Sequence, residues 1–150
     1  MRLLLLTFYY EPDLSAGSFR AQALVEALKR QCGGNFVIDV LTTMPNRYHS
    51  HATKAEPLEK RDEVTTIRRI PLPSHKSGMI DQSRAFLRFG REILRATQGQ
   101  RWDVVVATSS RLMTAVLGAR LAQRGRMPLY LDIRDLFTDT MNDLLQGRPL

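Results

Sequence analysis

Near its amino terminus the chain reads Arg2-Leu3-Leu4-Leu5-Leu6-Thr7-Phe8, a run of apolar residues that is almost unbroken. Such a run predicts a strand covered on both faces, as in a parallel sheet. Residues 18–31 place apolar side chains at helical spacing, and Ser15 or Ser18 is the expected N-cap. The glycines at 33–34 predict the end of this helix. The chain therefore opens with a strand, a turn and a helix.

The same alternation continues along the chain. Strands are predicted at residues 36–41, 64–70, 102–107 and 128–133, and helices at 81–97, 111–124 and 136–146. Short links between them predict a mostly parallel sheet with right-handed crossovers, which is an α/β, Rossmann-like, doubly wound fold. The polar residues 44–63 are the exception and predict a long loop. Because such sheets commonly continue to a sixth strand, we expect residues 1–150 to be an incomplete domain.

Composition narrows the class of protein. The 150 residues are 43% hydrophobic and 25% charged, which is typical of one folded domain. The apolar start is too short for a membrane span, and we interpret it as a buried strand of a cytoplasmic protein. The single Cys32 excludes an internal disulfide. His49 and His51 lie near Glu56 and Glu59, but two histidines in a polar loop are weak evidence for a metal. We expect neither a metal nor a cofactor.

Positive charge is concentrated in one part of the sequence. Between residues 84 and 126 there are nine arginines and two acidic residues, so this window accounts for the whole net charge of +7. The nine are Arg84, Arg88, Arg91, Arg95, Arg101, Arg111, Arg120, Arg124 and Arg126. A basic field this local would attract an anionic partner, such as membrane lipid, nucleic acid or a phosphorylated ligand.

The first four of these arginines recur at helical spacing. Arg84, Arg88, Arg91 and Arg95 fall within an arc of roughly 60° on a helix, at about 100° per residue. Phe86, Phe89, Ile93 and Leu94 lie on the opposite side. A basic amphipathic helix of this kind can lie on an anionic membrane surface. The alternative is that the apolar side packs on the sheet and the arginines are a solvated face.

The methionines Met113 and Met127 are expected in the core.

The turn after the first strand is where such folds bind ligands. It contains neither G-x-G-x-x-G nor G-x-x-x-x-G-K-[ST], which argues against a standard dinucleotide fold or a P-loop. Instead, Gly17 and Ser18 precede or begin a helix, where backbone amides can meet an anionic oxygen. Arg20 could add charge in the first turn. The alternative is a loop glycine with a solvated arginine.

These residues also carry a family resemblance. After the first strand, Tyr10-x-Pro12-x-x-x-x-Gly17-x-x-Arg20 resembles the opening of family-4 glycosyltransferases of the GT-B fold. The likeness continues at residues 103–110. It is strongest at residues 128–137, which are similar to the x-D/E-x-R-D-L-W/F stretch of bacterial, fucosamine-transferase-like members that assemble surface polysaccharide.

The resemblance implies that residues 1–150 form the N-terminal, acceptor-side domain of such an enzyme. It would transfer a sugar from a nucleotide-sugar donor to a lipid-linked or saccharide acceptor in lipopolysaccharide or capsule synthesis. Family members bind the donor mainly through a second, C-terminal domain with a Glu-x7-Glu motif. We expect that domain to be absent from these residues, and the 150 residues alone to be inactive.

Roles for individual residues follow from the same resemblance. Gly17 would lie against the donor diphosphate. Ser109 and Ser110 occupy the turn after the fourth strand, where many relatives have a histidine that this sequence lacks. Arg134 could pair with phosphate, and Asp135 would be the catalytic group that accepts a hydrogen bond from the acceptor hydroxyl. The alternative for Arg134 and Asp135 is a structural pair that caps the next helix.

The resemblance also supports the membrane interpretation, because related enzymes use polyprenyl-linked acceptors at the inner leaflet. A different class of protein would be a non-catalytic Rossmann-like module that binds an anionic partner, either nucleic acid or a phosphorylated ligand, through the basic region from Arg84 to Arg126. We expect no nucleic acid partner, because the region lacks aromatic platforms and any known RNA-binding or zinc-finger pattern.

Overall fold

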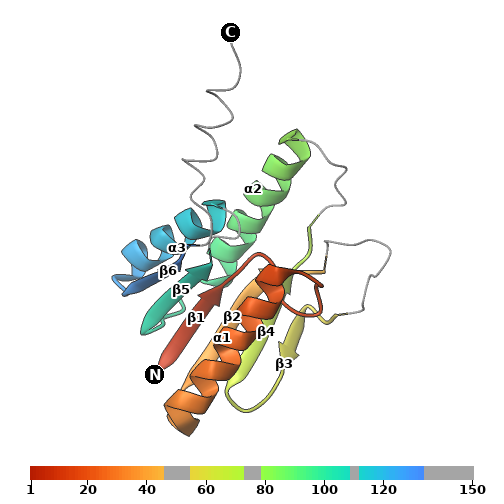
Figure 1. Cartoon of the computed structure of the whole chain (residues 1–150). Coiled ribbons are helices and arrows are strands. Elements are labelled where there is room, and N and C mark those ends of the chain that lie inside the picture. Colours follow the sequence, from red (N-terminus) through yellow and green to blue (C-terminus); the bar gives the residue numbers. More distant parts are fainter. Residues whose placement is uncertain (46–54, 73–78, 109–111, 134–150) are drawn as a thin grey trace, which may run out of the picture.

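The structure is a computed structural model and describes residues 1–45, 55–72, 79–108 and 112–133. These residues form one six-stranded sheet with the strand order β3-β4-β2-β1-β5-β6 (Figure 1). The strands are β1 (Arg2–Leu6), β2 (Val37–Thr43), β3 (Leu58–Lys60), β4 (Thr65–Ile70), β5 (Val104–Thr108) and β6 (Leu129–Asp132). All neighbours pair in parallel except β3 with β4. The predicted doubly wound α/β class is therefore confirmed.

Helices cover both faces of the sheet. Helix α1 (Ala16–Cys32) lies on one face, and α2 (Met79–Ala96) and α3 (Leu112–Gly125) lie on the other (Figure 1). A short 3-10 turn, Gly33–Asn35, follows α1, and Gly33 adopts a φ of 64° at the helix end. This is the left-handed conformation that glycine accepts without steric cost, as the sequence predicts.

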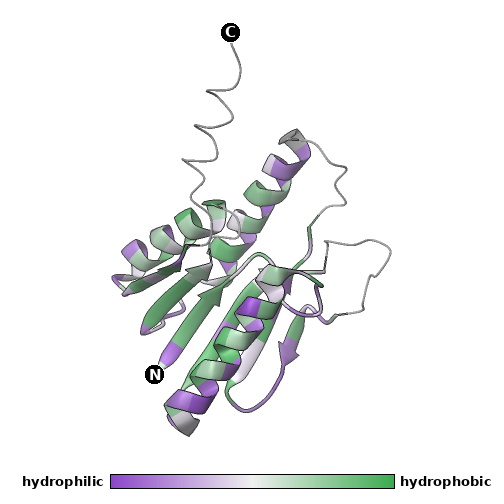
Figure 2. Cartoon of the chain, in the orientation of Figure 1, coloured by the Kyte–Doolittle hydropathy of each residue, from purple (hydrophilic) through white to green (hydrophobic). Residues whose placement is uncertain are grey.

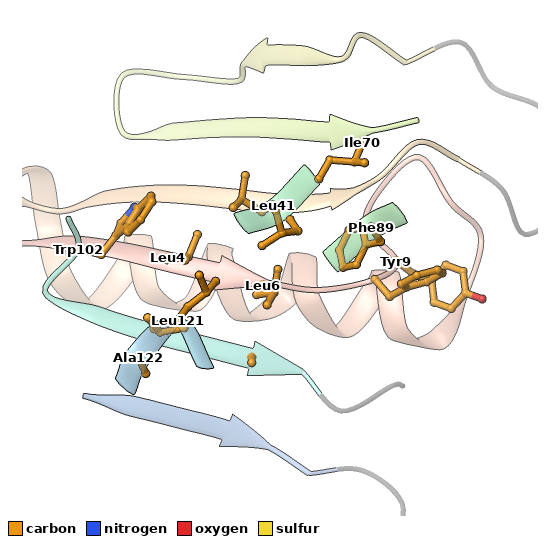
Figure 3. Packing of buried hydrophobic residues seen from close by; sticks show 13 residues of the cluster. Leu4, Leu6, Tyr9, Leu41, Ile70, Phe89, Trp102, Leu121 and Ala122 are labelled. Carbon is orange, nitrogen blue, oxygen red and sulfur yellow. The ribbon is translucent and has the colours of Figure 1, made fainter. Parts of the chain in front are cut away.

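Two apolar clusters fix these layers. The cluster under α1 includes Leu3 and Leu5 of β1. The cluster under α2 and α3 contains Leu4 and Leu6, and Figure 3 shows these side chains on the side of the sheet opposite to α1. Successive residues of a strand point to opposite faces, so the unbroken leucine run supplies both clusters. Coloured by hydropathy, β1 and β5 are mostly hydrophobic, whereas the edge strand β3 is mostly hydrophilic (Figure 2).

The structure corrects two of the expectations. The expected loop 44–63 contains β3, which pairs antiparallel to β4 at the edge of the sheet. Three residues reading Leu-Glu-Lys are too short and too polar to give a strand signal. Met113 is 51% exposed and does not fill the core. The expected helix 136–146 lies outside the described residues.

No helix among the described residues is long and apolar enough to cross a membrane.

Candidate functional site

The carboxyl ends of the parallel strands lie at one edge of the sheet, together with the start of α1 (Figure 1). Ligands of doubly wound folds bind at this edge. The turn between β1 and α1, residues 7–15, is its central part, because β1 lies between β2 and β5. We call this edge, with the first turn of α1, the carboxyl-edge site.

Threonine side chains hold the turn after β1 in place. The Thr43 hydroxyl donates to the Phe8 carbonyl at 2.7 Å, and Thr42 donates to the same oxygen at 3.3 Å. The Thr108 hydroxyl donates to Thr7 Oγ1 at 3.0 Å, and Thr7 in turn donates to the Tyr9 carbonyl at 3.0 Å. All four threonines are buried. These threonines are not among the predicted site residues, although the sequence places a threonine at or just after the end of β1, β2 and β5.

The N-terminus of α1 already uses one of its amides. Ser15 is the N-cap, and its hydroxyl accepts from the Ser18 amide at 3.1 Å. Of the two predicted caps, Ser15 is therefore the observed one. Ser15 has extended backbone angles, whereas Ser18 is buried inside the helix. The Ser18 amide is therefore committed to the cap, and an anion at this helix end would meet the amides of Ala16 and Gly17 first.

Arg20 has a carboxylate partner within the protein. Its Nε donates to Asp132 Oδ2 at 2.9 Å and its Nη2 to Asp132 Oδ1 at 2.6 Å, a bidentate pair. The hydrogen bonds to Asp132 raise the pKa of Arg20. The pair joins the first turn of α1 to the last residue of β6, 112 positions away in sequence. Arg20 is a predicted site residue, whereas its partner Asp132 is not.

A buried arginine supports the same turn from the side of β3. Arg69 is only 2% exposed, and it donates to the Glu11 carbonyl at 2.9 Å and the Glu56 carbonyl at 3.1 Å. It also pairs with the Glu59 carboxylate at 2.7 Å, while Arg61 pairs with Glu11 and Glu59. These hydrogen bonds, first that of Arg61, hold the pKa of Glu59 below its ordinary value. The group lines a hollow of about 260 Å³.

Tyr10, the first residue of the family pattern, lies in the turn after β1, and its side chain is buried. Burial is the main cause that raises the pKa of its hydroxyl, and the nearby Glu11 carboxylate adds to it. Tyr10 packs in the apolar cluster under α1. It therefore stays neutral and contributes to the shape of the turn rather than to its charge.

Four predicted site residues, Ser109, Ser110, Arg134 and Asp135, lie outside the described residues. The described chain stops next to both pairs, at Thr108 and at Ile133. Thr108 and Asp132, which end β5 and β6, are neighbours in the pairing of these strands. Gly17, Ser18 and Arg20 are described and belong to the first turns of α1.

The predicted basic face of α2 is present. Arg84, Arg88, Arg91 and Arg95 are all exposed, while Phe89 and Ile93 are buried against the sheet. Arg120 and Arg124 are exposed on the neighbouring α3. We call the exposed surface of α2 and α3 the basic face.

Residue types that bind metals do not cluster in the described part of the chain. Within the described ranges, no three histidine, cysteine or acidic residues come close enough to hold a metal ion. His49 and His51 lie outside these ranges, and Glu59 is paired with arginines.

Fold and site define a doubly wound α/β protein with its candidate site at the carboxyl edge of the sheet. No family model and no curated protein sequence matches the chain. Among solved structures, the C-terminal domain of a hydrogenase from Pyrococcus furiosus has a TM-score of 0.54 at 13% identity, covering 87% of this chain and 90% of that domain.

A second solved structure is a UGT transferase from Siraitia grosvenorii in complex with UDP. It has a TM-score of 0.48 at 13% identity, and the match covers 87% of this chain and 27% of the transferase. At such low identity these similarities concern the fold alone, and function has to be argued from the site.

Proposed function

We propose that this chain is the acceptor-side domain of a GT-B glycosyltransferase, which moves a sugar from a nucleotide-sugar donor to a lipid-linked or saccharide acceptor of a cell-surface polysaccharide. One observation supports it above others. The family pattern lies in three segments, and the bidentate pair joins the first, which ends at Arg20, to the third, which contains Asp132. The residues on which the resemblance rests thus meet at the edge where doubly wound folds bind ligands.

In the proposed chemistry, some groups of the carboxyl-edge site bind the negative charge of the donor, and another accepts a proton from the acceptor. The amide of Gly17 at the start of α1 would face a diphosphate oxygen, because a helix N-terminus carries partial positive charge. Arg134 would add positive charge, whereas the charge of Arg20 is largely offset by its bidentate pair with Asp132. Asp135 would accept the proton of the acceptor hydroxyl, and Ser109 and Ser110 would line the same edge. The donor nucleoside would be held mainly by a second domain.

Gly17→Val in the full-length protein tests this assignment. A side chain at Gly17 would occupy the space that a phosphate needs, so transfer from nucleotide-sugar donors should be lost while unfolding stays cooperative. Ala23→Val is the matched control, because Ala23 is exposed in the same helix and away from its N-terminus. Full activity in a folded Gly17→Val protein would remove the helix terminus from the mechanism.

Asp135→Asn tests the proton-transfer role. This change preserves size and removes charge, so transfer should slow by about 10²-fold or more, with the melting temperature unchanged. A helix-capping role would instead cost about 1 kcal/mol of stability and leave the rate intact. Kinetics and thermal unfolding measured on one sample distinguish the two roles.

The basic face supports a second element of the proposal, which is docking on an anionic membrane surface. All four arginines of α2 are exposed, although Arg95 is paired with Glu92, and Arg120 and Arg124 are exposed on α3, which covers the same face of the sheet. Each arginine near such a surface contributes on the order of 1 kcal/mol, and salt weakens this attraction. A binding module for another anionic partner would use the same arginines.

Changing Arg84, Arg88, Arg91 and Arg95 together to glutamine tests the docking. Glutamine and arginine have similar helix propensity, so α2 should persist. Co-sedimentation with anionic vesicles should fall strongly in this variant, and wild-type binding should weaken as salt rises. Vesicles of neutral lipid are the control. Equal, salt-independent binding of both proteins would make the arginines a solvated face.

A further inference from the structure

The basic face is hollowed between its two helices. A groove of about 760 Å³ runs between α2 and α3, and most of the side chains that line it are apolar. They are Phe86, Leu87, Phe89, Leu94, Met113, Val116 and Leu117. Leu87 is 73% exposed, Val116 is 52% exposed and Met113 is 51% exposed, so three large apolar side chains meet water here. Isolated exposed apolar residues are ordinary, but several around one groove indicate a binding surface.

The charges around the groove have one sign. Arg91 and Arg120 line it directly, one from each helix, and no acidic residue is among its lining residues in the described part of the chain. Arg88 lines a separate hollow toward β4, so the charge of the groove itself comes from Arg91 and Arg120. An occupant would therefore combine an apolar part with negative charge at its edge.

We propose that this groove receives the hydrocarbon chain of an anionic membrane lipid, with the headgroup phosphate held by Arg91 and Arg120, which line it from the two helices. The inference rests on the proposed membrane docking and adds to it. Docking through the arginines alone is electrostatic and reversible by salt, whereas a buried chain adds an apolar contribution that salt does not screen.

Charge argues against a second copy of this chain as the occupant. A two-fold dimer through the groove would bring the same surface of each copy together, and thus Arg91 and Arg120 of one against those of the other. Like charges opposed across an interface are unfavourable. A lipid bilayer instead offers apolar chains beneath a layer of phosphates, which matches exposed leucine, valine and methionine flanked by one arginine from each helix.

An environment-sensitive fluorophore tests the insertion. It is attached to Val116→Cys in a Cys32→Ser background, and the control carries it on native Cys32, the free, exposed cysteine at the end of α1. With vesicles of phosphatidylglycerol and phosphatidylcholine, the label at 116 should shift to the blue and be quenched by nitroxides on the acyl chains. The label at 32 should change in neither respect. A label at 116 that stays in water while the protein co-sediments overturns the proposal.

Leu87→Gln is the second test and needs no label. At low salt it should bind the same vesicles nearly as well as wild type, because the arginines remain. At about 0.5 M NaCl, where charge is screened, it should bind about tenfold more weakly than wild type, since a leucine no longer enters the apolar layer. Equal binding at high salt overturns chain insertion and leaves electrostatic docking intact.

Two further outcomes identify other causes. Absence of wild-type binding at low salt overturns membrane docking and the insertion with it, but leaves glycosyl transfer to be judged by the Gly17 variant. A lipid-free dimer in analytical ultracentrifugation that Val116→Asp dissociates would assign the groove to a second copy, and overturns the proposal.

Discussion

Arg69 holds a full positive charge almost out of water and connects three parts of the chain. Its guanidinium bonds the carbonyl after β1, a carbonyl before β3 and the Glu59 carboxylate of β3. A buried charge is costly unless such partners compensate it. In the sequence, Arg68 and Arg69 looked alike and both interrupted an apolar strand. Only the structure shows that one is inside and the other outside.

Arg69→Met should lower the free energy of unfolding by about 3 kcal/mol, because two carbonyls lose their donor and Glu59 keeps only its pair with Arg61. Arg68→Met is the control: its side chain is exposed, and the change should stay within about 0.5 kcal/mol. Urea unfolding of the three proteins measures both. Similar small losses of unfolding free energy in the two variants would mean that the buried contacts of Arg69 do not stabilise the fold.

Site residues were partly visible in the sequence. Gly17 and Arg20 follow from the position of the first turn, since a strand followed by a helix places them at the ligand edge. Asp132 could not be paired with Arg20 from sequence, because a bond across 112 residues depends on which strands are neighbours. The threonines that fix the turn were passed over because threonine has no distinctive chemistry of its own.

At the scale of elements, α3 comes unusually close to β5. A Cβ built on Gly118 would lie 2.5 Å from the Ala107 Cβ, so the helix and strand can approach only because both residues are small. Sequence periodicity predicted this helix and this strand near their observed bounds. It did not predict their separation, which depends on which residue of α3 faces the sheet.

Gly118→Ala should lower stability by about 1–2 kcal/mol, since overpacking outweighs the gain in helix propensity. Gly90→Ala is the matched control, because a Cβ added to Gly90 in α2 would meet no atom within 4 Å. That change should raise stability by about 0.5–1 kcal/mol. Thermal unfolding should therefore move in opposite directions for the two substitutions, and a shift in the same direction would contradict the packing.

At the scale of the whole molecule, the sheet has a protected centre and two weak edges. β1 is paired on both sides, whereas β3 has three residues and only β4 as a neighbour, and β6 pairs with β5 alone among the described strands. The alternation of strands and helices predicts such a sheet. The sequence does not predict the antiparallel β3, because its three residues carry no apolar pattern; the structure shows that Glu59 of β3 also pairs with Arg69 of β4.

Hydrogen exchange should follow this arrangement. The amides of Leu4, Leu5 and Leu6 should exchange only through global unfolding, because both neighbouring strands must separate first. Amides of β3 and β6 should exchange faster, by local opening. Exchange measured residue by residue by NMR under native conditions tests this. Uniform protection across the sheet would mean that the edges are as stable as the centre.

The central place of β1 also has a consequence for biosynthesis. Leu3 pairs with Ile38 on one side and with Val104 on the other. During translation the nascent chain can therefore join β1 to β2 early, while the opposite edge of a strand made of four leucines stays open until residue 104 has left the ribosome. Contacts so distant in sequence form slowly, and an open apolar edge is prone to wrong pairing. The position of one strand thus leaves the edge of β1 that faces β5 exposed to wrong partners until residues 104–107 are available.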